Sequence, residues 1–118
     1  MKKILENLHK IYFISKMLHW NTTKSYQNHL LYDRIASGMI EAMDTVAESC
    51  ILPFDKVENL DLKITNYSLD ELKRIIEETA NDIQEKCSSN QITEGAKNTL
   101  SGIAEQLNIK GYLIRNNL

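Results

Sequence analysis

The sequence predicts an all-α fold: one domain, residues 1–118, in which four helices form a bundle with one long crossover. The chain contains only one proline and four glycines, the residues that most often interrupt helices. Apolar side chains recur at intervals of three and four residues in four segments. The connections between these segments are short, long and short, and this order selects the topology. A chain of 118 residues is long enough for one domain with its own core.

The first two helices are predicted on either side of a polar turn. The first runs over about Lys2–Trp20, where apolar side chains follow helical spacing. The polar residues Asn21–Ser25 predict the turn. The second helix spans about Ser25–Leu52 and ends before Pro53, because proline cannot continue the helical hydrogen bonds.

The third helix is predicted to open at Ser68 with a capping box, in which Ser68 and Glu71 satisfy each other's backbone donors. Its apolar stripe extends to Cys87, and the polar residues 88–90 end it. The fourth helix runs from about Ile92 to near the C-terminus. Three glycines weaken this last helix or permit close packing against a neighbour.

Connection lengths indicate how the helices are arranged. Short turns join the first helix to the second and the third to the fourth, so each pair is expected to form an antiparallel hairpin. The link Pro53–Tyr67 has about fifteen residues, against a median of about 4–6 in compact domains. Fully extended it reaches about 45 Å, enough to run back along a helix. One long crossover between two hairpins predicts a ferritin-like four-helix bundle.

Composition excludes several classes of function. A net charge of −2, with Lys2-Lys3 as the only basic cluster near a terminus, makes nucleic acid an unlikely partner. No apolar run is long enough for a membrane span and no signal-peptide pattern opens the chain, so we expect a cytoplasmic protein. Cys50 and Cys87 are interpreted as reduced structural thiols, with a mutual disulfide as the alternative.

One stretch carries five side chains of the types that bind metal ions. Four of them form two pairs at i,i+4 spacing, which places each pair on one face of a helix. Their neighbours are mostly apolar, and a carboxylate that enters an apolar environment needs a cation or strong donors. Residues 30–52 contain no lysine, and their one arginine, Arg34, points elsewhere, so a metal ion is the simplest partner. The five candidates are His19, His29, Asp33, Asp44 and Glu48.

The spacing of the candidates predicts a site shared between two chains. On one continuous helix the two pairs share a stripe about a quarter-turn wide that borders the apolar face. Along the axis, however, His29 and Asp44 would be about 22 Å apart. Ligands of one ion must lie within about 2–2.5 Å of it, so one chain cannot close the site. Two chains related by a two-fold axis would form two equivalent sites, which predicts a homodimer as the minimal metal-binding unit.

Two further features bear on this site. His19 is expected near the end of the first helix, just across the turn from the first pair, and Trp20 would pack near the site or shield it from solvent. The alternative is a site within one chain, built from Glu-x-x-His motifs. The chain has one such motif, Glu6 and His9, and no second copy. A solvated surface pair is therefore the simpler interpretation of Glu6 and His9.

The combined motif resembles that of the mini-ferritins, the DNA-binding proteins from starved cells (Dps). The resemblance covers about residues 11–50 and implies an iron site between two subunits, in an assembly that extends to a dodecamer. It implies that His19, His29 and Asp33 act from one subunit and that Asp44 and Glu48 act from its neighbour. The turn before the second histidine is short and lacks the family's glycine, which fits a shortened or phage-type relative. The matching elements are His19-Trp20-Asn21, His29-x-x-x-Asp33 and Asp44-x-Val46-Ala47-Glu48.

These inferences predict a ferroxidase that oxidises Fe²⁺ with oxygen or peroxide at an intersubunit site. Mixed imidazole and carboxylate ligands suit iron and would also accept zinc or manganese. One alternative is a metal-binding dimer that stores no mineral. The other is a helical scaffold whose site no longer binds metal.

Overall fold

The computed structural model describes residues 1–90 and 92–118. Within these ranges the chain is helical with no strand, so the all-α prediction is confirmed. Residues 52–67 and the turn at residues 22–25 contain no helix or strand. The helices are α1 (Lys2–Asn21), α2 (Tyr26–Ala36), α3 (Met39–Val46), the π-helical segment η1 (Ala47–Ile51), α4 (Leu69–Cys87) and α5 (Glu94–Asn117).

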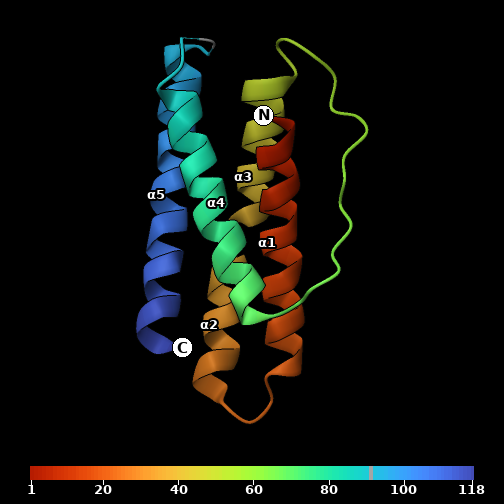
Figure 1. Ribbon diagram of the computed structural model, residues 1–118, viewed down its shortest axis with the longest axis vertical. Helices are drawn as coiled ribbons and strands as arrows, with labels where there is room; N and C mark the ends of the chain where they lie inside the picture. Colours follow the sequence, from red (N-terminus) through yellow and green to blue (C-terminus); the bar gives the residue numbers. More distant parts are fainter. Residues whose placement is uncertain (91) are drawn as a thin grey trace.

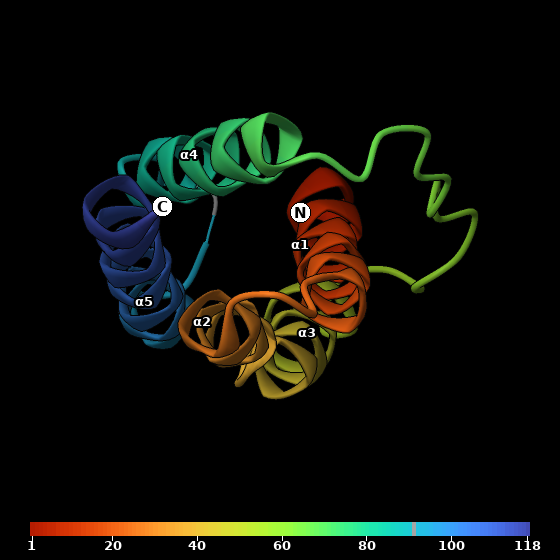
Figure 2. The same ribbon diagram turned by 90° about the horizontal axis from the view of Figure 1, so that it is seen from below.

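The helices form two antiparallel hairpins that enclose one core. Figure 1 shows α1 running beside the rod made by α2, α3 and η1, and α4 running beside α5. Seen from below, the rods form a ring in which α4 lies beside α1 and α2 lies beside α5 (Figure 2). The helices α1 and α4 pack against each other, and α3 also contacts α5. The apolar stripes meet inside this ring. Fully buried side chains from all parts of the ring include Leu8, Ile11, Ile35, Val46, Leu72, Ile83, Leu100 and Leu107.

The second helix is not continuous, and the prediction of one helix over residues 25–52 is wrong in this respect. It breaks at Ser37–Gly38, where Gly38 has φ +82°, a backbone conformation that glycine adopts at little cost. The amide of Ser37 still donates to the carbonyl of Asp33 at 3.0 Å, as in a regular helix, but the extended backbone of Ser37 (ψ 135°) ends α2. The chain then resumes as α3 and widens into η1 before the non-helical residues that include Pro53. Because of the break, the two candidate pairs do not lie on one regular helical stripe.

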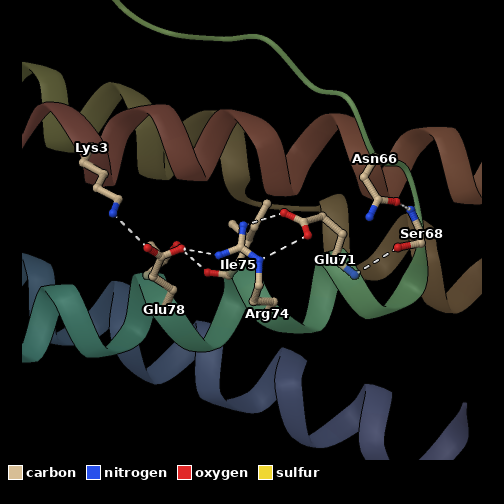
Figure 3. Close-up of polar contacts among 8 residues, drawn as sticks. Lys3, Asn66, Ser68, Glu71, Arg74, Ile75 and Glu78 are labelled. Carbon is tan, nitrogen blue, oxygen red and sulfur yellow. Dashed lines mark hydrogen bonds and ion pairs between the residues drawn. The ribbon is translucent and has the colours of Figure 1, made fainter.

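The start of α4 departs in part from the predicted capping box. The hydroxyl of Ser68 accepts a hydrogen bond from the amide of Glu71 at 3.1 Å, as predicted. The reciprocal bond is replaced, because the amide of Ser68 donates to the side chain of Asn66 and the Glu71 carboxylate pairs with Arg74 (Figure 3). A guanidinium one turn away is a charged partner and competes well for that carboxylate.

An ion-pair network links α1 to α4. Arg74 bridges Glu71 and Glu78 along α4, and Lys3 of α1 reaches Glu78 with an Nζ–Oε1 distance of 2.9 Å (Figure 3). Lys3 is the cation that pairs across the two helices, whereas both partners of Arg74 lie on α4 itself. Exposed pairs of this kind contribute little each, about 0–1 kcal/mol, so the network mainly fixes orientation while the apolar core supplies stability.

Residues 52–68 form the crossover between the hairpins. Figures 1 and 2 show this segment running outside the ring, along α1, from the end of η1 to the start of α4. Leu60 and Ile64 pack against the core and hold the segment to the bundle. The amide of Asp61 donates to the carboxylate of Glu6 on α1. In the described part of the chain, no helix has both the length and the apolar character that a membrane crossing requires.

Candidate metal centre

The structure brings His19 and His29 into direct contact. Their rings stack with centroids 3.8 Å apart and planes inclined by 24°. The Nδ1 atom of His19 lies 2.6 Å from the backbone oxygen of His29, and the Nδ1 atom of His29 lies 2.7 Å from the backbone oxygen of His19. A carbonyl oxygen can only accept, so both Nδ1 atoms must carry the proton. In the neutral rings both Nε2 atoms therefore keep a lone pair for a metal ion.

Local capping in the turn explains this contact. At the end of α1, the hydroxyl of Thr22 donates to the carbonyl of Leu18 at 2.6 Å. The start of α2 is capped by Ser25, whose hydroxyl accepts from the amide of Asn28 at 3.2 Å. With both helix ends capped inside so short a turn, the last turn of α1 faces the first turn of α2. This placement puts the two histidines opposite each other.

Asp33 lies one turn beyond His29 on α2 and forms an ion pair with Lys16 of α1. The Nζ–Oδ1 distance is 2.7 Å, and the Asp33 side chain is 48% exposed. The hydrogen bond from Lys16 holds the pKa of Asp33 below its usual value and raises the pKa of Lys16. The prediction of a metal ion as the simplest partner of this carboxylate is corrected here. It rested on residues 30–52, which contain no lysine. The cation comes from the neighbouring helix.

Asp44 and Glu48 lie beyond the break, on α3 and η1, and both are exposed. Within the described residues, no three or more histidine, cysteine, aspartate or glutamate side chains are grouped so that they could hold a metal ion. One chain therefore presents the two halves of the predicted site separately. The expectation that Asp44 and Glu48 complete the site of a neighbouring copy stays a prediction.

Trp20 presents much of its side chain to solvent. Its side chain is 56% exposed, although it follows His19 directly. Tyr26 and Leu30, on either side of His29 in the sequence, are 76% and 46% exposed. The expectation that Trp20 packs near the site or shields it from solvent stays a prediction.

The alternative pair, Glu6 and His9, is used differently. Glu6 accepts the hydrogen bond from the crossover, as described above. His9 contacts the ring of Phe13 with centroids 4.8 Å apart. Partial burial, with a smaller contribution from Lys10, lowers the pKa of His9. These contacts give Glu6 and His9 structural roles.

Sequence reasoning missed two lysines that contact the rod made by α2, α3 and η1, which is called the second rod below. Lys16 pairs with Asp33, and it could have been found as the residue one helical turn before His19 on the same face of α1. Lys110 of α5 is buried against the break between α2 and α3. The spacing of Leu107, Lys110 and Ile114 places Lys110 on the apolar stripe of α5 and could have indicated its burial, but its partners at the break depend on how α5 packs. Comparison with known protein families and with curated proteins finds no match to this chain.

Proposed function

We propose that this protein is a homodimer that binds Fe²⁺ at sites shared between its two chains and oxidises it to Fe³⁺. The observation that carries the proposal is the pair His19 and His29, each with Nδ1 bound to a backbone carbonyl. Two imidazoles with available Nε2 atoms, one helical turn from a carboxylate, form the first half of a donor set that suits iron. Zinc and manganese would bind the same donors.

The second half of each site comes from Asp44 and Glu48 of the neighbouring chain. Both side chains are exposed on the second rod, so a second copy of the chain can approach them. A two-fold axis would make the exchange reciprocal, so that one dimer holds two equivalent sites. The exposed Trp20, Tyr26 and Leu30 supply apolar surface beside the histidines for such an interface.

The donor set explains why oxidation would be favoured. Carboxylates bind Fe³⁺ more strongly than Fe²⁺, because Coulomb attraction grows with the charge on the ion. Asp33, Asp44 and Glu48 together would therefore stabilise the product of the reaction. Each Fe²⁺ gives up one electron, and oxygen or peroxide accepts electrons and protons to form water. The protein supplies binding and electrostatics, while the metal carries the redox chemistry.

Lys16 competes with the proposed metal ion for the carboxylate of Asp33. The ammonium of Lys16 lies 2.7 Å from Oδ1 of Asp33, so iron that binds this oxygen must displace it. Exchange of one cation for another keeps the carboxylate paired in both states. The same exchange lowers metal affinity relative to an unpaired aspartate, because the ion pair must first be broken.

The arrangement of helices is compatible with a ferritin-like bundle. Two antiparallel hairpins joined by a crossover that runs along the molecule are the features of that class (Figure 1). The proposed chemistry requires only the dimer. A native mass measurement distinguishes the dimer from a larger assembly such as a dodecamer.

The test is an Fe²⁺ titration without oxygen, followed by addition of oxygen or peroxide while Fe³⁺ absorbance is recorded. We expect stoichiometric, rapid oxidation by the wild type and loss of both binding and oxidation in His29→Ala. His9→Ala is the matched control, because it removes the remaining histidine and should leave oxidation unchanged. Stoichiometric binding without oxidation would replace the proposal with a metal-binding dimer. Absence of binding would leave a helical scaffold.

A further inference from the structure

A cavity opens between α5 and the break in the second rod, away from the histidines. Its volume is about 560 Å³. We call it the Lys110 cavity. Its polar and charged lining includes Arg34, Glu41 and Thr45 from the second rod and Thr99, Gln106 and Lys110 from α5.

Lys110 is the unusual group in this cavity. Its side chain is 7% exposed, and its Nζ donates to the carbonyls of Ser37 at 2.8 Å and Arg34 at 3.1 Å. Both carbonyls lie at the end of α2, and that of Arg34 also accepts a hydrogen bond from the amide of Ser37 at 3.2 Å. Desolvation, with a smaller contribution from Arg34, lowers the pKa of Lys110 to about 8.

No acidic side chain in the described residues forms an ion pair with Lys110. Buried charges in proteins are normally paired, because taking an ammonium out of water is costly. The two carbonyls satisfy hydrogen bonds but carry no full negative charge. The third N–H of the ammonium remains for another acceptor. Lys110 is thus a buried cation that borders a cavity and lacks an anion.

The surrounding groups define which anion fits. Arg34 adds a second cation to the lining, and Glu41 subtracts one charge, which leaves a surplus of one positive charge. A monoanion balances this surplus, and a dianion such as phosphate exceeds it. Met39, Ala42 and Ile103 supply apolar lining for a hydrocarbon tail. The planar guanidinium of Arg34 matches a carboxylate through two parallel hydrogen bonds.

We propose that the Lys110 cavity binds a small organic monocarboxylate, with its carboxylate between Lys110 and Arg34 and its hydrocarbon part against Ile103. The first amides of α3, which no side chain caps, lie at the same break and favour the same sign of charge. This site is separate from the proposed metal centre and does not depend on it.

The test is an NMR titration of the full-length protein with hexanoate at constant ionic strength, with inorganic phosphate as the comparison anion. We expect saturable shifts of the backbone amides of residues 38–42 and 102, and weaker or no saturation with phosphate. Shifts that rise linearly without saturation, or phosphate binding as tight as hexanoate binding, would overturn the proposal.

Three variants locate the binding. Arg34→Gln changes an exposed side chain, so the fold should persist, and hexanoate affinity should fall about tenfold or more. Lys110→Met keeps the length of the side chain and should also lose binding. Lys97→Met, on the same helix but outside the cavity, is the control and should bind as the wild type does. Wild-type affinity in Arg34→Gln would contradict the assignment even if Lys110→Met failed to fold.

Discussion

At the scale of single residues, main-chain atoms set the chemistry of the histidines. Each Nδ1 donates to the other residue's carbonyl, so a protonated ring would have to place its second N–H, on Nε2, where a metal ion is expected. Metal binding and protonation of these rings therefore compete. The ion pair of Lys16 with Asp33 adds a second competition at the same place.

Replacing Lys16 tests the second competition. Lys16→Met should tighten Zn²⁺ binding by up to about fivefold, because the metal no longer competes with an ammonium for Asp33. Isothermal titration calorimetry with Zn²⁺, which has no redox chemistry, measures this directly. Lys10→Met, a lysine of α1 outside the contacts of Asp33, is the control. Unchanged or weaker Zn²⁺ binding in Lys16→Met would show that the lysine does not oppose the metal.

Lys110 predicts a dependence of stability on pH. Its pKa is about 8 in the folded chain and about 10.4 when unfolded, so between these values the unfolded chain binds more protons. Below pH 8 the buried charge of Lys110 lowers the free energy of unfolding by its full amount. This loss of stability disappears as the pH rises toward 10. Relative to Lys110→Met, the wild type should gain up to about 1.4 kcal/mol per pH unit across this window. Urea unfolding at several pH values measures it; parallel curves would refute the prediction.

At the scale of elements, the sequence predicted the helices well and the break poorly. Spacing of apolar residues located all the helical segments, Pro53 marked the end of the second rod, and Ser68 marked the start of α4. The break at Ser37–Gly38 was missed, because a single glycine within a helical pattern usually costs stability without ending the helix. At the break Ser37 is extended, Gly38 has a positive φ, and Lys110 of α5 binds the carbonyls of Arg34 and Ser37. No pattern local to residues 25–52 contains the contact from Lys110.

A pair of glycine substitutions tests the break. Gly38→Ala meets no atom within 4 Å, but its φ of +82° should cost about 1–2 kcal/mol of unfolding free energy. Gly102→Ala also meets no atom within 4 Å but lies inside α5, where alanine should stabilise by up to about 1 kcal/mol. Chemical denaturation of both variants should give opposite signs. Stabilisation by Gly38→Ala would mean that the second rod is continuous in solution.

At the scale of the whole molecule, the candidate site is divided between two places. His19 lies near the end of α1 and His29 near the start of α2, whereas Asp44 on α3 and Glu48 on η1 lie beyond the break. Sequence spacing predicted that one chain cannot join these halves, because helix rise alone separates them. Spacing could not predict the stacked imidazoles or the exposed Trp20, which depend on how the turn folds. The central claim is therefore that each metal site is shared between two chains.

Mixing two inactive variants tests that claim most directly. The double variant His29→Ala/Asp33→Ala loses one half of each site, and Asp44→Ala/Glu48→Ala loses the other half. Each should fail to oxidise Fe²⁺ alone. After the two are unfolded together and refolded, each heterodimer should contain one intact site, and oxidation should return in proportion to the heterodimer measured by native mass spectrometry. Confirmed heterodimers without any oxidation would contradict the account of a site shared between chains.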